Sequence, residues 1–123
     1  MVVLDTSVVL DLIEGDESVL KSLRQFSDQR IGITLFTEYE VRRGQDERNK
    51  DKIDRVIGTF GECEFDHNAL NEAIKIYKDL EGRGRLINEI DILIAATSIS
   101  NGEVLLTRDH DFEEIGSPRI RVI

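Results

Sequence analysis

Residues 2–15 read VVLDTSVVLDLIEG, and this stretch predicts a buried strand that runs directly into a helix. The apolar run of the strand ends at Asp5, after which apolar residues recur at helical spacing. The helix should end at Gly15, because glycine readily adopts the left-handed conformation found at helix ends. A strand followed by a helix is the repeating unit of α/β folds, so this stretch indicates the fold class.

The same arrangement returns near the other end of the chain. Residues 104–106 form a second short apolar run, and Thr107, Arg108 and Asp109 follow it. In an open α/β sheet, ligands bind outside the carboxyl ends of the strands. We therefore expect Asp5 and Asp109 to lie at one edge of the sheet.

Further strands and helices alternate between these two stretches. Strands are expected at residues 31–35, at residues 62–65 and, near the end of the chain, at residues 120–123; helices are expected around residues 19–26, before Gly44, and at 53–60, 70–80, 90–96 and 112–115. The predicted stripe of the 70–80 helix is Leu70, Ala73, Ile74, Tyr77 and Leu80. Alternation of this kind predicts a parallel sheet covered by helices on both faces, a three-layer α/β/α sandwich.

Length and composition favour one compact domain spanning residues 1–123. The chain is 40% hydrophobic and 33% charged, and no apolar run approaches the length of a membrane span. No secretory signal is visible, and the single Cys63 cannot form an internal disulfide. We expect a soluble cytoplasmic protein without a membrane partner.

The net charge of −9 argues against a polyanionic partner, because nucleic-acid binding normally rests on a basic surface. Bound divalent cations would offset part of this charge. Residues 42–55 carry six basic and four acidic side chains, a net charge of +2. This stretch fits a phosphate contact or an ordinary solvated helix surface.

Four acidic residues could form a metal-binding cluster: Asp5, Glu40, Asp91 and Asp109. Each also has a structural interpretation. Asp5, Asp91 and Asp109 could cap helices. Glu40 could close a capping box with Thr37.

The spacing of the acidic residues narrows these choices. Glu38 and Glu40 point to nearly opposite faces of a helix, so only one of them can enter a given pocket. Asp91 opens the most apolar helix of the chain, where an unpaired aspartate is costly. Asp109 and Asp111 flank His110, and one could cap the next helix while the other binds metal; we favour Asp109 as the ligand because it is nearer the strand end.

Carboxylates without a cysteine or histidine cluster suit Mg²⁺ or Mn²⁺ rather than zinc. A cluster of this kind predicts a metal-dependent hydrolase.

Four sequence motifs now resemble those of PIN-domain ribonucleases, and more closely the VapC toxins of prokaryotic toxin–antitoxin modules. The motifs are VVLDTSVVLDLIEG at residues 2–15, TEYEVRRG at 37–44, INEIDILIAATSISNG at 87–102 and LLTRDHDF at 105–112. The resemblance assigns the catalytic and metal-binding acids to Asp5, Glu40, Asp91 and Asp109, with Asp111 as an additional ligand. It gives Thr6, Ser7 and Thr107 secondary roles in the site and selects Glu40 over Glu38.

This resemblance implies a five-stranded parallel sheet and an endoribonuclease that hydrolyses RNA with Mg²⁺ or Mn²⁺. It also implies a homodimer and a VapB-like antitoxin that covers the acidic pocket. Two alternatives stay open. The chain could be a non-catalytic PIN-like module that binds RNA or a partner, or a PIN nuclease of RNA maturation.

Overall fold

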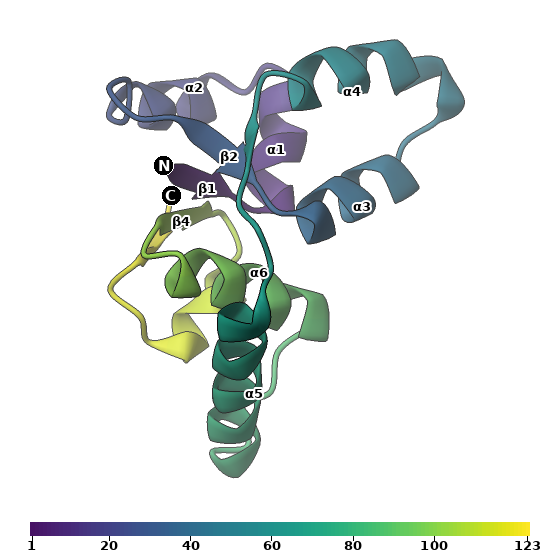
Figure 1. The fold of residues 1–123 in the computed structure, drawn as a ribbon. Helices are drawn as coiled ribbons and strands as arrows, with labels where there is room; N and C mark the ends of the chain where they lie inside the picture. The colour runs from purple at the N-terminus through teal and green to yellow at the C-terminus, as the bar shows by residue number, and fades with distance from the viewer.

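A computed structural model describes all of residues 1–123 and contains one five-stranded parallel sheet (Figure 1). The strands are β1 (Val2–Leu4), β2 (Ile31–Ile33), β3 (Gly61–Glu62), β4 (Val104–Thr107) and β5 (Ile120–Val122). Their order in the sheet is β3-β2-β1-β4-β5, and every pair of neighbours is parallel. The predicted α/β class and five-stranded parallel sheet are confirmed.

Helices cover both faces of this sheet. They are α1 (Thr6–Ile13), α2 (Glu17–Arg24), α3 (Leu35–Arg43), the 3₁₀ helix η1 (Glu47–Asn49), α4 (Lys50–Ile57), α5 (His67–Gly82), α6 (Glu89–Ser100) and the 3₁₀ helix η2 (His110–Ile115). In Figure 1, α1, α2 and α4 lie on one side of the sheet, and α6 and α5 lie on the other. The three-layer arrangement follows from this placement.

Strand β1 lies at the centre of the sheet and contributes to both cores. Successive side chains of a strand point to opposite faces. Val2 and Leu4 join the core beneath α1, α2 and α4, whereas Val3 packs with residues of α6. All three side chains are fully buried, which explains why β1 is a continuous apolar run rather than an alternating one.

Helix α6 is buried between the sheet and α5, as its all-round apolar character predicts. Its residues Ile94 and Ala95 pack with the core of the sheet, while Ile92 and Ala96 pack against α5. The helix ends at Ser100, Asn101 is its C-cap, and the backbone of the next residue, Gly102, has a φ of 72°. None of the helices combines the length and the apolar character that a membrane span requires.

The predicted strand at residues 31–35 is too long. It ends at Ile33, and Leu35 is already the first residue of α3, with 63% of its surface exposed. Thr34 caps this helix by accepting a hydrogen bond from the Thr37 amide. The predicted capping box between Thr37 and Glu40 is therefore wrong, because Thr37 lies within the first turn of the helix.

The predicted apolar stripe of α5 is partly wrong. The buried residues of this helix are Ala69, Ala73, Ile76 and Leu80. Leu70 and Ile74 are 38% and 47% exposed. Further predicted boundaries also differ: among them, β3 ends at Glu62, α2 ends at Arg24, α4 ends at Ile57, and the 3₁₀ helix before the last strand begins at His110.

The strand order creates a switch point between β1 and β4. From β1 the chain adds β2 and then β3 in one direction, whereas β4 and β5 extend the sheet in the other. Crevices at the carboxyl ends of strands form at such points. The residues that follow β1 and β4 lie at this crevice.

Candidate active site

Asp5 follows β1 and is only 3% exposed. It caps α1 by accepting a hydrogen bond from the Val8 amide at 3.0 Å, so the capping interpretation holds. Its carboxylate also accepts hydrogen bonds from the hydroxyls of Ser7, at 2.7 Å, and Thr107. Burial raises the pKa of Asp5, while the bonds from Thr107, Ser7 and Val8 act in the opposite direction. The carboxylate is thus fixed by three donors from β4 and α1.

Glu40 reaches the same edge from α3. Its Oε1 accepts a hydrogen bond of 2.6 Å from the hydroxyl of Thr6. Its Oε2 lies 3.9 Å from the guanidinium of Arg43. Glu38, two residues earlier, turns away and pairs with Arg42 at 2.9 Å. The opposite orientations predicted for Glu38 and Glu40 are confirmed.

Asp91 enters the site from the first turn of α6. The cap of this helix is Asn88, whose side chain accepts a hydrogen bond from the Ile90 amide, so a capping role for Asp91 is excluded. The pKa of Asp91 is raised to about 7, first by burial and then by the charges of Glu40 and other acids of the site. Ionisation of Asp91 is therefore disfavoured in the metal-free protein.

Asp109 follows β4 and caps η2, because its Oδ1 accepts a hydrogen bond from the Asp111 amide at 2.9 Å. Its own amide donates to the hydroxyl of Thr107 at 2.9 Å. The cap of this helix is therefore Asp109 rather than Asp111, which is exposed. His110 is also on the surface, where it lies beside Glu113.

The predicted acids share one electrostatic environment. Glu40, Asp109, Asp5 and Asp111 all raise the pKa of Asp91, in that order. No three carboxylate, histidine or cysteine side chains form a ready-made metal site, however. The structure thus brings the predicted acids to one edge of the sheet without assembling a complete coordination sphere. Their oxygen donors match the preference of Mg²⁺ and Mn²⁺.

The basic residues of the 42–55 stretch are largely paired with neighbouring acids. Arg42 and Lys50 both contact Asp54, at 2.7 and 3.0 Å. Arg48 pairs with Asp46 at 3.1 Å. These pairs favour the interpretation of the stretch as a solvated helix surface.

Sequence reasoning did not identify Arg108 as part of this region. The residue stands between Thr107 and Asp109, and its backbone amide donates to the Ser7 hydroxyl at 3.1 Å. Its side chain extends to Asp11 on α1. Ser7 and Asp11 are four residues apart on one helix and so share a face, but nothing local in the sequence links that face to Arg108.

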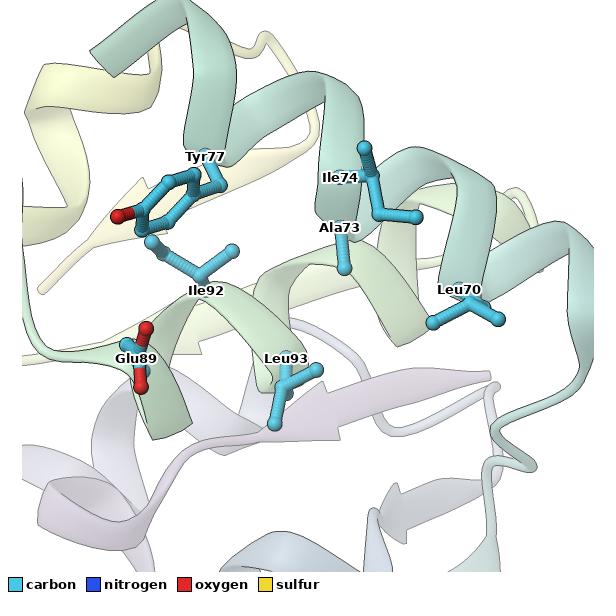
Figure 2. Close-up of a pocket in the computed structure, with 7 residues that line it drawn as sticks. All are labelled: Leu70, Ala73, Ile74, Tyr77, Glu89, Ile92 and Leu93. Atoms are coloured by element: carbon cyan, nitrogen blue, oxygen red, sulfur yellow. The ribbon is translucent and has the colours of Figure 1, made fainter. Parts of the chain in front are cut away.

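A separate apolar hollow of about 270 Å³ lies between α5 and α6 (Figure 2). Six of its seven lining residues are apolar, and Glu89 is the exception. Leu70 and Ile74, the exposed members of the predicted stripe, line it together with Tyr77. Asp91, two positions from Glu89, is not part of this lining.

Comparison with known proteins identifies relatives of this arrangement. A family model described as the PIN domain matches residues 2–118. Ribonuclease VapC1 of Methanocaldococcus jannaschii is 28% identical over 109 residues, which cover 88% of this chain and 75% of that protein.

Solved structures share the fold. DNA-bound VapBC from Salmonella typhimurium superposes with a TM-score of 0.85 at 25% identity, covering 99% of this chain and 96% of the matched chain. VapBC2 from Rickettsia felis, bound to a fragment of promoter DNA, gives a TM-score of 0.86 at 22% identity, covering 100% and 98%. The resemblance read from the four motifs is confirmed at the level of the family: this chain belongs to the PIN-domain family.

Proposed function

We propose that this protein is a metal-dependent endoribonuclease and the toxin of a type II toxin–antitoxin pair. The observation that supports the proposal is the environment of Asp91, whose pKa is raised to about 7 by burial and then by the charges of Glu40, Asp109 and Asp5, near the edge where β1 and β4 end. Strongly shifted pKa values in a crevice are characteristic of functional sites.

The relatives support the choice of reaction and partner. The curated relative is named a ribonuclease, and solved structures with the same fold are VapBC complexes. A VapB-like antitoxin is the corresponding partner for this chain. The proposed acidic site favours an antitoxin segment that brings positive charge, because burying the carboxylates without a counter-charge is costly.

The donor set fits Mg²⁺ or Mn²⁺, which bind hard oxygen ligands. Asp5, Glu40, Asp91 and Asp109 would hold the ion, with Asp111 as an additional ligand. When bound, such a cation supplies positive charge to the scissile phosphate and lowers the pKa of a coordinated water. Asp91 must lose its proton to become a ligand, so cation binding should release a proton near neutral pH.

The surrounding side chains position these acids. Ser7 and Thr107 fix the orientation of the Asp5 carboxylate, and Thr6 fixes that of Glu40. Hydroxyl donors suit this task because they hold a carboxylate in its charged form without adding a competing charge. These contacts support the secondary roles that we propose for Thr6, Ser7 and Thr107.

The reaction is hydrolysis of a phosphodiester bond by water. The water oxygen bonds to phosphorus, the bond from phosphorus to the 3′ oxygen breaks, and that oxygen takes up a proton. The products are a 5′-phosphate and a 3′-hydroxyl. Attack by the ribose 2′-hydroxyl would instead leave a 2′,3′-cyclic phosphate, so analysis of the product ends tests the mechanism.

We further propose that residues 1–123 act as one PIN domain in the cytoplasm and that the chain forms a homodimer. A PIN nuclease of RNA maturation would use the same chemistry. Expression in bacterial cells separates the two roles, because a toxin should arrest growth unless its antitoxin is expressed with it. A maturation nuclease should not arrest growth.

A non-catalytic module that binds RNA or a partner is the second candidate. Such a module has no need for Mn²⁺ binding or for an ionisable Asp91. Isothermal titration with Mn²⁺, in wild type and in Asp91→Asn, distinguishes the two. Tight binding that the substitution abolishes supports the nuclease, whereas absence of binding by both proteins supports the module.

A further inference from the structure

We infer that Arg108 is a positioning residue, whose ion pairs clamp the loop that carries Asp109 against α1 and the start of α2. The inference rests on the proposed function, because the purpose of the clamp is to hold Asp109 at the site of the cation. Arg108 itself touches none of the four proposed ligands through its side chain.

The first contact is made by the backbone. The Arg108 amide donates to the Ser7 hydroxyl at 3.1 Å, and this hydroxyl donates in turn to Asp5 Oδ1 at 2.7 Å. One residue later, the Asp109 amide donates to the hydroxyl of Thr107, which also binds Asp5. The loop is therefore connected to Asp5 through two hydroxyl groups.

The second contact is made by the guanidinium. Its Nη1 lies 2.8 Å from Asp11 and 3.2 Å from Asp16, and its Nη2 donates to the Ser18 hydroxyl at 2.7 Å. Asp16 is held in turn as the cap of α2. The arginine thus bridges three segments: the loop after β4, the helix α1 and the first turn of α2.

These contacts oppose the electrostatic repulsion between two carboxylates of the site. Asp5 and Asp109 are both linked to the hydroxyl of Thr107, so their two carboxylates lie in one region and like charges repel. Asp109 lies on a loop, which gives way more easily than a strand end. Because Ser7 and Asp11 are one helical turn apart, α1 holds both the backbone and the side chain of Arg108. The loop is fixed at two points before a cation is bound.

A direct role in binding RNA phosphate is the rival interpretation of Arg108. The guanidinium already contacts two carboxylates and a hydroxyl, and together with Asp11 and Asp16 it forms a group of net charge −1. The side chain is 31% exposed. A negative, satisfied group of this kind attracts phosphate poorly, so the positioning role is favoured.

Loss of the clamp should weaken the cation site rather than RNA binding. Groups that orient metal ligands typically contribute about 10- to 100-fold to metal affinity or activity. We expect Arg108→Met to weaken Mn²⁺ affinity about 10-fold. Arg108→Lys should recover only part of this loss, because an ammonium group cannot reproduce the fork of donors that spans Asp11, Asp16 and Ser18.

The experiment compares the wild type with Arg108→Met, Arg108→Lys and Asp11→Asn. Arg83→Met is the matched control, since Arg83 also pairs with an aspartate, Asp79, and also bonds a second segment, at the Glu114 carbonyl. Two quantities are measured: hydrogen exchange of the amides of residues 107–109 without metal, and Mn²⁺ affinity by calorimetry. Steady-state cleavage of RNA then separates kcat from KM.

The clamp predicts faster exchange at residues 107–109 and weaker Mn²⁺ binding in Arg108→Met and Asp11→Asn, with both quantities unchanged in Arg83→Met. Unchanged exchange and unchanged Mn²⁺ affinity, with a higher KM for RNA, would overturn the clamp in favour of a phosphate contact. Absence of Mn²⁺ binding by the wild type would instead contradict the proposed function, and with it the metal-related role of the clamp. The exchange data would still decide whether the loop is held by Arg108.

Discussion

Thr6 donates its hydroxyl hydrogen to Glu40 at 2.6 Å, which joins the first residue of α1 to the middle of α3 across 34 positions of sequence. Asp5 and Asp109 stand close to the ends of β1 and β4, and Asp91 stands in the first turn of α6. Glu40 is the exception among the four proposed ligands, because it lies within α3. Its carboxylate lies on a helix that packs against α1, and this bond fixes its orientation. Because of this hydrogen bond, a substitution of Thr6 tests the role of Glu40 without removing a carboxylate.

Substitution of Thr6 by valine should lower the rate of RNA cleavage about 10- to 100-fold, because a hydrogen bond to a charged group contributes about 1.5 to 3 kcal/mol. Thr6→Ser keeps the hydroxyl and should retain most of the activity. The measurement is kcat/KM with Mn²⁺ for the three proteins. Equal activity of the valine variant would mean that Glu40 needs no such support.

Asp91 should make stability depend on pH in the metal-free protein. Burial and the neighbouring acids raise its pKa in the folded state to about 7, from the ordinary aspartate value of 3.8. Between these values the folded protein holds a proton that the unfolded chain has lost, so stability falls as pH rises from about 4 to 7. A difference of about three pKa units corresponds to at most about 4 kcal/mol. Urea unfolding at pH 5 and pH 8, in chelator, measures the part of this loss above pH 5, about two of the three pKa units.

Asp91→Asn provides the matched control, since asparagine cannot ionise. In chelator it should unfold at higher urea concentration than the wild type at pH 8, and its stability should vary less between pH 5 and pH 8. A less stable variant at pH 8 would show that the Asp91 carboxylate makes favourable contacts in the metal-free protein, contrary to our account.

Mn²⁺ should stabilise the wild type, because a ligand that binds only the folded state shifts the unfolding equilibrium. At a free concentration one hundred times its dissociation constant, the gain is about 2.7 kcal/mol, or a rise of about 10 °C in Tm for a chain of this size. Thermal unfolding with Mn²⁺ and with chelator measures the difference. An equal rise in Asp91→Asn would place the cation elsewhere.

The corrected stripe of α5 leads to a contrast between two of its residues. Leu80 is fully buried, so Leu80→Ala should cost about 3 kcal/mol through lost packing and a cavity. Ile74 is 47% exposed, and Ile74→Ala should change stability by less than about 1 kcal/mol. Chemical denaturation of the isolated chain compares them. Similar losses for the two variants would restore the stripe expected from the sequence.

The order of apolar residues along the sequence correctly predicted the elements that are apolar on every face. The continuous apolar runs of β1 and β4 and the all-round apolar α6 each have a single physical interpretation, and the structure confirms all three. The acids that follow β1 and β4 could be placed at one edge because parallel strands present their carboxyl ends together. The position of Asp91 in the first turn of α6 was predictable from a different pattern. The apolar run of that helix begins at Ile90, so Asp91 had to lie near the start of the helix.

The sequence-based predictions failed for features that depend on contacts between elements far apart in the chain. Thr34 and Thr37 are both acceptable caps in sequence, and only the end of β2 at Ile33 shows which of them is used. Leu70 and Ile74 fit the helical period of α5 as well as Ile76 does, but the position of α6 determines which face of α5 is covered. The contacts of Arg108 span 97 positions to Asp11, and no local pattern predicts a pair at that separation.

The central claim is that a carboxylate-bound cation catalyses RNA hydrolysis at this edge of the sheet. The most direct measurement is cleavage of structured RNAs, including tRNAs, by purified protein with Mn²⁺, with chelator and with Asp91→Asn. Our account predicts cleavage that requires Mn²⁺, leaves 5′-phosphate and 3′-hydroxyl ends, and is lost in Asp91→Asn. Cleavage that persists in chelator, or that Asp91→Asn retains at the wild-type rate, would contradict it.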